Sequence, residues 1–348
     1  MKRVYVLLVL LLSISGLLSA CQSDLQTDQQ RRPIYLGEPD TAEAHQAVVG
    51  LVEVWQGNLE AFCTGTLITP TVVLTAAHCL DDYELTEVQI YFGDDVTGGG
   101  VFIDVDHWDQ HPDWDPSNPD SPDDIALIRL AEPAPAGILP ITPLPESLGL
   151  GETDEGADVD LSGFGETEDL TYDVKLHVPV PIGKVCGGPS ECPFDGDWVA
   201  PRAFGYSQQA GGPCTGDSGG PAFIWRGDFE YVAGVTSYGG DCLDFGVSTT
   251  VDRYQTWIED VAGITGAEDC QAAGDDDGDG RPDCTDPDCA DDPCCDDPPN
   301  CDTDPTSSDG GCNQSGRSGL PGLPFPLTLT LAILLLSTRW RGCFSGRG

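Results

Sequence analysis

The chain has 348 residues and a formal net charge of −44, from 59 acidic against 15 basic residues. Charge of that sign repels phosphate backbones and anionic lipid, so nucleic-acid binding is excluded as the main function. Hydrophobic residues make up 39% of the chain, enough for a sizeable core, while 43 Gly and 28 Pro argue against an all-helical protein. The length suggests one large domain or two smaller ones with appended segments.

The N-terminus predicts export. A basic start is followed by an apolar run over residues 4–18, which ends in the letters LSAC at Cys21. This ending is similar to a bacterial lipobox and implies lipidation of Cys21; the alternative is an ordinary signal-peptidase site with an incidental cysteine. We therefore expect a signal peptide at 1–21 and a polar spacer or propeptide at 22–33. An oxidising compartment also suits a chain with 15 Cys.

The body of the chain is predicted to be mostly β. Short runs rich in Val, Ile, Thr and aromatic residues alternate with clusters of Gly, Pro and Asp, as in a succession of strands and turns. Only residues 253–261 have a convincing helical period, which predicts one short helix near the end of the domain. A Pro-rich stretch at 139–150 divides the body into two halves. The predicted strand runs are 47–54, 71–78, 88–92, 125–130 and 231–238.

Three short motifs contain residue types suited to nucleophilic catalysis. LTAAHC, DDIALIRL and CTGDSGGP contain His78, Asp124 and Ser218, in that chain order. A serine hydroxyl is a weak nucleophile that needs an adjacent base, and the base needs a third group to fix its tautomer. Gly216 allows a tight turn that aims its own N–H and that of Ser218 at one point, which predicts an oxyanion hole.

Together these motifs resemble those of the chymotrypsin/trypsin-type serine proteases, and the segment CTGTLI before the catalytic histidine matches the family too. The resemblance implies an all-β fold of two antiparallel six-stranded β-barrels with a short C-terminal helix. The protease domain would span 34–265, with barrels at about 34–140 and 150–250. It also implies hydrolysis of protein or peptide substrates in the cleft between the barrels, without a catalytic cofactor.

The resemblance further implies disulfide bonds beside the active site. By motif, Cys63 pairs with Cys79, and Cys214 pairs with Cys242. The family's second-barrel disulfide lacks a partner near Phe204, so Cys186 and Cys192 are expected to pair with each other.

Substrate preference is predicted from three glycines that match the family's specificity pocket. Gly212 stands where trypsin-like members carry an acidic residue at the pocket floor, and Gly239 and Gly246 match the pocket walls. An uncharged, open pocket predicts an apolar or aromatic side chain before the scissile bond. Because Asp241 and Asp244 lie close in sequence, a preference for Arg or Lys stays open.

Activation departs from the family pattern. Ile34 matches the family's new N-terminus, whose ammonium pairs with the residue before the catalytic serine, here Asp217. The residue before Ile34 is Pro33, so either another activating protease cuts there or the mature enzyme orders its pocket differently. Two rival functions stay open, a catalytically silent surface-binding scaffold and a zymogen restricted to one partner. The complete triad favours an active endopeptidase.

The segment 266–319 is predicted to be an acidic, Cys-rich stalk with too little apolar sequence to fold by burial alone. Oxygen ligands recur at the spacing of a calcium loop, with Gly280 at its sharp turn, which predicts a structural Ca²⁺ site. The alternative is a solvated stalk held by local disulfides. The predicted ligands are Asp275, Asp277, Asp279, Asp283 and Asp286 through their carboxylates, and Arg281 through its carbonyl.

An apolar segment with a basic end, at 320–341, closes the chain. With Cys312 before it, this region resembles the Cys-containing sorting tails of myxobacteria and their relatives. The resemblance implies processing at Cys312 by a sorting enzyme and display at the bacterial cell surface or outer envelope. A plain transmembrane anchor is the alternative.

The remaining histidines, His45, His107, His111 and His177, stand in no motif that would give them a chemical role. The sequence therefore gives no reason to assign any of them as a ligand. We therefore expect surface or loop positions for all four.

Overall fold

A computed structural model describes residues 33–55, 58–118, 121–167, 172–227 and 229–264. The chain divides into two compact units, Met1–Cys312 and Asn313–Gly348, and all the described residues belong to the first. The lipobox, the calcium-loop motif, Cys312 and the C-terminal apolar segment lie outside the described residues. Within the described ranges, no helix is both long and apolar enough to cross a membrane.

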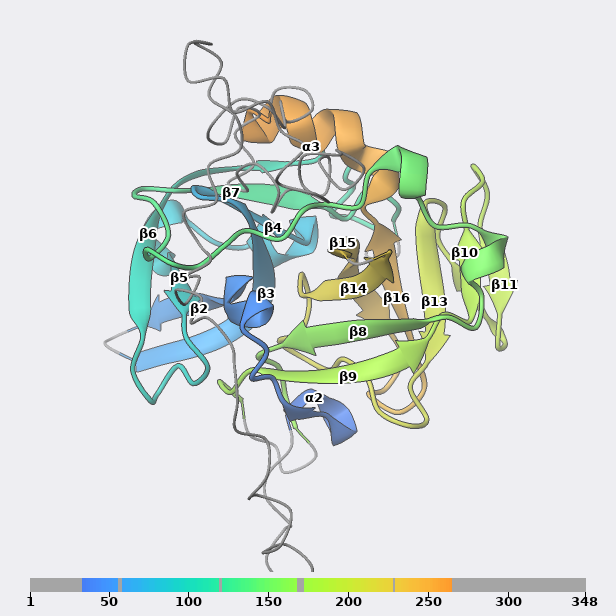
Figure 1. The fold of residues 1–348 in the computed structure, drawn as a ribbon, viewed down its shortest axis with the longest axis horizontal. Coiled ribbons are helices and arrows are strands. Elements are labelled where there is room, and N and C mark those ends of the chain that lie inside the picture. The colour runs from blue at the N-terminus through green and yellow to red at the C-terminus, as the bar shows by residue number, and fades with distance from the viewer. Residues whose placement is uncertain (1–32, 56–57, 119–120, 168–171, 228, 265–348) are drawn as a thin grey trace, which may run out of the picture. The chain divides into compact units, whose positions relative to one another are not determined.

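The first half of the domain is a closed six-stranded barrel, as expected (Figure 1). Its strands follow the order β2-β3-β4-β7-β6-β5, and every neighbouring pair is antiparallel. The short strand β4 is buried along its whole length, because its four residues VVLT face other barrel strands and the core. The strands are β2 (Val48–Trp55), β3 (Asn58–Thr69), β4 (Val72–Thr75), β5 (Val88–Phe92), β6 (Val101–Gln110) and β7 (Ala126–Leu130).

The second half is an antiparallel sheet of eight strands in the order β1-β9-β8-β14-β15-β16-β13-β10. Its described pairing leaves the sheet open, whereas a second closed six-stranded barrel was expected. On β9, Pro179 and Pro181 lie opposite Asp160 and Asp158 of β8, and neither proline has a backbone N–H to donate. The strands are β1 (Glu38–Pro39), β8 (Asp158–Gly163), β9 (Leu176–Pro181), β10 (Lys184–Cys186), β13 (Ala203–Ser207), β14 (Pro221–Arg226), β15 (Phe229–Gly239) and β16 (Phe245–Thr250), with a separate hairpin of β11 (Cys192–Phe194) and β12 (Asp197–Val199).

The predicted C-terminal helix is present as α3 (Gln255–Ala262). The residues before it form the 3-10 turn η6 (Asp252–Tyr254), so the helix begins later than its sequence period indicated. Gly263 ends the helix in the left-handed conformation, with φ of 81° and its N–H bonded to the Glu259 carbonyl. Ile258 is buried against the first-half core, which holds the helix on the barrel.

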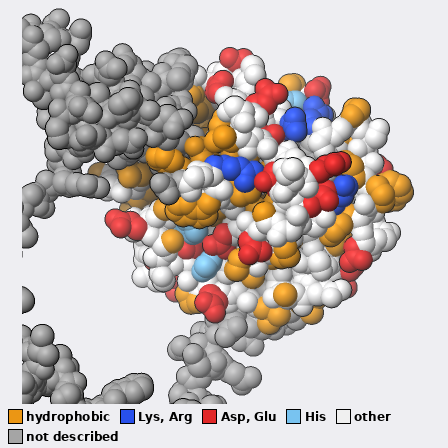
Figure 2. Space-filling model, turned by 45° about the vertical axis from the view of Figure 1, so that its right-hand side comes forward, with side chains coloured by type: hydrophobic (Ala, Val, Ile, Leu, Met, Phe, Trp, Pro, Cys, Tyr) orange, Lys and Arg blue, Asp and Glu red, His pale blue; other side chains and the backbone are white. Residues whose placement is uncertain are grey.

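Short helices and 3-10 turns connect the strands. They are α2 (Pro33–Leu36), η1 (Ala44–Ala47), η2 (Ala77–Leu80), η3 (Leu85–Glu87), η4 (Glu146–Leu148) and η5 (Glu152–Asp154). Acidic side chains are scattered over the visible face of the molecule, with a few basic ones between them (Figure 2). The negative charge is thus present on the folded domain and not only in the acidic segment that follows it.

Candidate active site

His78 and Asp124, predicted from separate motifs, are joined side by side in the structure. The Asp124 Oδ2 atom lies 2.8 Å from His78 Nδ1, and Asp124 Oδ1 accepts the backbone N–H of His78 at 2.9 Å. His78 stands in η2, directly after β4, and Asp124 lies just before β7, so the pairing of these two strands brings the residues together. With Nδ1 donating to the carboxylate, Nε2 is left as the basic nitrogen.

Asp124 is almost fully buried, with 1% of its surface exposed. Ser237 on β15 donates its hydroxyl to Asp124 Oδ2 at 2.5 Å, which gives the carboxylate a third donor. Burial disfavours the protonated imidazole of His78, but the hydrogen bond and charge of Asp124 outweigh this effect and raise the pKa of His78. The site is therefore built to stabilise an imidazolium next to Asp124. Ser237 was missed from the sequence because no motif there marks it.

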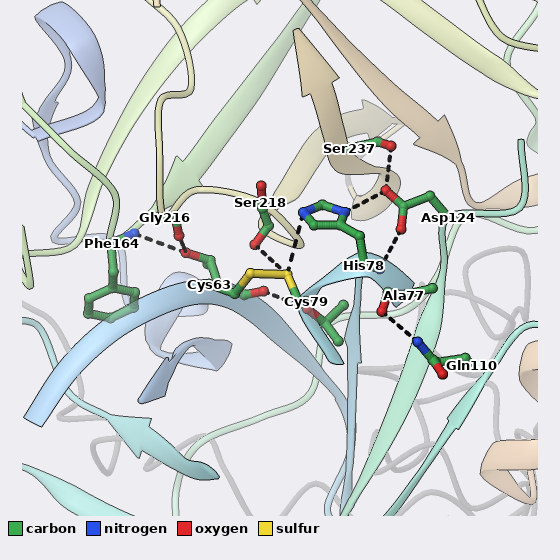
Figure 3. The surroundings of a disulfide bond; sticks show 12 residues. Cys63, Ala77, His78, Cys79, Gln110, Asp124, Phe164, Gly216, Ser218 and Ser237 are labelled. Atoms are coloured by element: carbon green, nitrogen blue, oxygen red, sulfur yellow. Dashed lines mark hydrogen bonds and ion pairs between the residues drawn. A yellow bond between two sulfur atoms is a disulfide. The ribbon is translucent and has the colours of Figure 1, made fainter. Parts of the chain in front are cut away.

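Ser218 lies on the side of the His78 ring away from Asp124 (Figure 3). Within the described residues, no hydrogen bond joins the Ser218 hydroxyl to His78. Catalytic hydrogen bonds are often long in a site without substrate and tighten when the substrate binds. The arrangement nevertheless places a hydroxyl, an imidazole and a buried carboxylate in the order that activates a serine.

The turn that carries Ser218 depends on glycine. Gly216 has φ of 96° and Gly219 has φ of 82°, in the left-handed region that other residues rarely adopt. A Cβ on Gly216 would approach Gly165 Cα to 2.9 Å. Across the described part of the chain, the backbone N–H groups of Gly216 and Ser218 donate to no acceptor. Two such free donors beside a nucleophile are what an oxyanion hole requires.

Thr64 on β3 fastens this turn to the first barrel. Its N–H donates to the Ser218 carbonyl at 2.8 Å, and its hydroxyl donates to the Gly216 carbonyl at 2.9 Å. The same hydroxyl oxygen accepts the N–H of Phe164 at 3.1 Å. Thr64 thus orients the peptide units that follow Gly216 and Ser218, next to the two free N–H groups. Its place in CTGTLI did not indicate this role.

Three disulfide bonds are present among the described residues, and they join the pairs that the family resemblance implied. The Cα–Cα distances are 6.2 Å for Cys63–Cys79, 5.7 Å for Cys186–Cys192 and 5.0 Å for Cys214–Cys242. The first bond ties β3 to the turn that holds His78, as Figure 3 shows. The bonds close loops with sequence separations of 16, 6 and 28 residues, which contributes roughly 2–4 kcal/mol each to stability.

Comparison with known proteins places this arrangement in a family. Residues 35–258 match the family model described as Trypsin, a stretch that includes all three motifs and well over half of the chain. The chain belongs to the trypsin family. A protein named trypsin from Phaedon cochleariae is 31% identical, over 60% of this chain and 82% of its own length.

Two further relatives are longer proteins. The CLIP domain-containing serine protease HP8 of Bombyx mori is 33% identical, over 57% of this chain and 60% of its own length. Vitamin K-dependent protein C of Mus musculus is 27% identical, over 59% of this chain and 47% of its own length. This trypsin-family chain therefore spans less than two thirds of the length of these two relatives.

Asp217, next to the nucleophile, is buried without a cation. Its carboxylate accepts the N–H groups of Gly165 at 2.7 Å and Cys214 at 2.9 Å, and no ion pair to it exists among the described residues. Burial raises the pKa of Asp217 to about 7, because two backbone amides do not offset the lost hydration of the charged form. Ile34, the predicted ammonium partner, lies in α2 with its side chain fully buried in the second-half core. Insertion of its amine at Asp217 stays a prediction and would require Ile34 to leave that core.

The three pocket glycines are each packed against a neighbour. A Cβ on Gly212 would lie 2.5 Å from the Nε2 atom of Gln208, and one on Gly239 would lie 2.5 Å from the Phe245 carbonyl oxygen. A Cβ on Gly246 would meet the ring of Tyr206. Close approach by these neighbours, and not only an open pocket, accounts for glycine at these positions.

His45 was expected at a surface or loop position; it lies in the connecting turn η1, but it is buried and not on the surface. The ring is 3% exposed, with Nδ1 at 2.8 Å from Asp40 and Nε2 at 3.2 Å from Glu230. Burial opposes protonation, but the bonds to both carboxylates outweigh it and raise the pKa of His45 to about 9. Ser162 donates to Asp40 at 2.6 Å, so the network pins the N-terminal segment to β8 and β15.

Two groups in the described part of the chain bring together atoms of metal-ligating type. The first contains Cys63 and Cys79, whose sulfurs are already in a disulfide. In the second, made by His111, Asp113 and Asp123, the carboxylate of Asp123 is already bonded to Arg202 at 2.6 Å. Neither group offers a set of free donors, and neither was predicted as a metal site.

Proposed function

We propose that this chain is a serine endopeptidase that hydrolyses peptide bonds through an acyl-enzyme intermediate. The observation that carries the proposal is the alignment of Asp124, His78 and Ser218 beside the two free N–H groups of Gly216 and Ser218. Membership of the trypsin family supports it. The reaction needs no catalytic cofactor, since every proton and charge in it has a protein group to receive it.

The chemistry follows from the positions of these groups. The Ser218 oxygen attacks the carbonyl carbon of the scissile bond, and its proton passes to His78 Nε2. The oxygen that becomes negative accepts hydrogen bonds from the N–H groups of Gly216 and Ser218, where the loss of one such donor costs about 3 kcal/mol. The C–N bond then breaks as Nε2 returns the proton to the leaving amine. Water attacks the acyl-enzyme by the same steps.

For specificity, we propose an uncharged residue before the scissile bond. Gly212 places no charge at the pocket floor, and Asp241 and Asp244 are exposed at the tip of the β15–β16 hairpin and so do not supply one there. The apolar or aromatic preference drawn from Gly212, Gly239 and Gly246 stays a prediction. A cationic preference has no buried carboxylate among these positions to support it.

We also propose that the protein is exported and held at the cell surface, by lipid on Cys21 or by the 320–341 segment after processing near Cys312. The support is the sequence pattern of these segments. An activating protease acting before Ile34, a sorting enzyme at Cys312 and a structural Ca²⁺ in the stalk belong to the same proposal. Surface binding by a silent or zymogen-locked scaffold is the alternative function.

Labelling with a serine-directed fluorophosphonate tests the proposal. The exported full chain is compared with Ser218→Ala and with Ser207→Ala, a matched serine outside the site. We expect labelling of the wild type and of Ser207→Ala, cleavage of casein by both, and neither by Ser218→Ala. An unlabelled wild type with a normal melting transition would show a folded but unassembled triad and favour the scaffold. The N-terminal sequence of the labelled protein identifies the activation cut.

A further inference from the structure

Gln208 is a buried polar residue next to the nucleophile turn that the mechanism above does not use. It follows β13 and has only 2% of its surface exposed. Its backbone N–H donates to the Asp244 carbonyl at 2.9 Å, and its carbonyl accepts the N–H of Gly211 at 3.0 Å. Its side-chain Nε2 donates to the Pro213 carbonyl at 2.5 Å. The residue is therefore held from both the nucleophile loop and the β15–β16 hairpin.

The bond to Pro213 fixes which way the carboxamide points. A carbonyl oxygen only accepts, so the amide nitrogen must face Pro213 and Oε1 must face away from it. Oε1 lies 3.5 Å from the point where a Cβ on Gly239 would stand, while Nε2 and Cγ lie 2.5 Å from the point for Gly212. The carboxamide thus lies between Gly212 and Gly239. Gly212 stands six residues before Ser218, and Gly239 stands two residues after Ser237.

The acceptor Oε1 of Gln208 has no hydrogen-bond donor in the described part of the chain. Among the described residues, the fully buried side-chain oxygens without a hydrogen-bond partner belong only to Asp252. Oε1 is not one of these fully buried atoms, so it keeps a small solvent-accessible area although Gln208 as a whole is 2% exposed. The disulfide Cys214–Cys242 joins the two loops on either side, so this acceptor is held on a rigid frame.

We propose that Gln208 determines the primary specificity of the enzyme and favours a carboxamide side chain, Gln or Asn, before the scissile bond. This inference rests on the proposed endopeptidase function and deepens it. A substrate carboxamide donates an N–H to Oε1 and remains neutral in a site that offers no charge. An apolar side chain would bury Oε1 without a donor, and a site built for hydrogen bonding rejects analogues that lack the group.

A cationic or acidic side chain fits less well. Arg or Lys would meet the dipole of a neutral amide without a counter-charge, since Asp241 and Asp244 lie exposed at the hairpin tip. Asp or Glu would set its charge against the lone pairs of Oε1. The carboxamide alone satisfies the acceptor without transferring a charge from water.

Peptide substrates that differ only in the residue before the reporter amide test this inference. The series carries Gln, Asn, Phe, Leu, Arg and Glu, and kcat/KM is measured for the wild type, Gln208→Leu, Gln208→Glu and the exposed neighbour control Gln209→Leu. We expect the wild type and Gln209→Leu to prefer Gln or Asn at least tenfold over Phe and Arg. Gln208→Leu should reverse the order toward Phe and Leu, and the isosteric Gln208→Glu should gain Arg cleavage at least tenfold.

Fluorophosphonate labelling of each variant shows that the triad is assembled before its profile is interpreted. A wild type that is labelled but prefers Phe or Arg overturns the inference. A labelled Gln208→Glu with the wild-type profile overturns it as well, even if Gln208→Leu fails to fold. A wild type that is not labelled overturns the proposed function itself, and this inference with it.

Discussion

Replacing Asp217 by Asn should change how the stability of the uncut chain depends on pH. Asp217 is 1% exposed and has two backbone N–H donors but no cation. Its pKa is raised to about 7 from the ordinary value of 3.8 because burial penalises the charged form. Asn has nearly the same shape as the protonated carboxyl group and does not ionise, so it keeps the neutral state at every pH.

The sign follows from the number of protons bound. Between pH 4 and pH 7 the folded state keeps the Asp217 proton while the unfolded state has released it, so stability falls as pH rises through this window. A shift of this size corresponds to about 4 kcal/mol, at 1.36 kcal/mol for each pKa unit. Above pH 7 both states are ionised and the loss is complete. The free energy of unfolding of Asp217→Asn relative to the wild type should therefore rise by about 4 kcal/mol between pH 4 and pH 8.

Urea unfolding at half-unit pH steps measures this difference, in a Ser218→Ala background that prevents self-cleavage. Every other titrating group is common to both proteins, so subtracting the two curves isolates Asp217. Parallel curves would refute the reasoning. The same measurement on protein that starts at Ile34 distinguishes the two activation hypotheses. An inserted ammonium would favour the charged carboxylate, and Asp217→Asn would then be the less stable protein at pH 8.

Three further predictions concern the site. Ser237→Ala removes a donor from the Asp124 carboxylate, and kcat/KM should fall about tenfold, as expected for a hydrogen bond to a charged group; an unchanged value would show that the bond is not needed. Thr64→Val leaves the Gly216 carbonyl and the Phe164 N–H without a partner, so stability should fall by about 1–3 kcal/mol in thermal or urea unfolding, with recovery in Thr64→Ser. Because the pKa of His78 is raised, kcat/KM should be lost as pH falls through a value above 6.5, and a midpoint well below 6.5 would contradict the role of Asp124.

The sequence predicted the residues that stand in short local motifs. His78, Asp124 and Ser218 lie in strings whose residue types have a chemical reason to occur together, and the cysteine pairs followed from the same family resemblance. The helix near the C-terminus was predicted from its period, although η6 replaces its first turn. The alternation of apolar runs and turns predicted a mostly β body, and the family resemblance implied the first barrel that the structure shows.

Residues that act across the fold could not be predicted in this way. Ser237, Thr64 and Gln208 come from different strands or their ends, and each gains its role from a partner more than a hundred residues away or on another loop. His45 has no motif, and only the approach of Asp40 and Glu230 makes its burial as a cation favourable. The open edge of the second sheet likewise depends on pairing that single runs of sequence do not specify.

The nucleophile turn combines catalytic geometry with a destabilising charge. Its glycines and the two bonds from Thr64 keep the oxyanion donors free in the uncut chain, and the carboxylate of Asp217 holds Gly165 and Cys214 on the other side. Holding them with a carboxylate is favourable when that group is protonated or paired, and costly when it is ionised alone. The turn should therefore be most stable in acid for the uncut chain and, once an amine reaches Asp217, at neutral pH. A protease built this way would become more stable at neutral pH through the same step that completes its site.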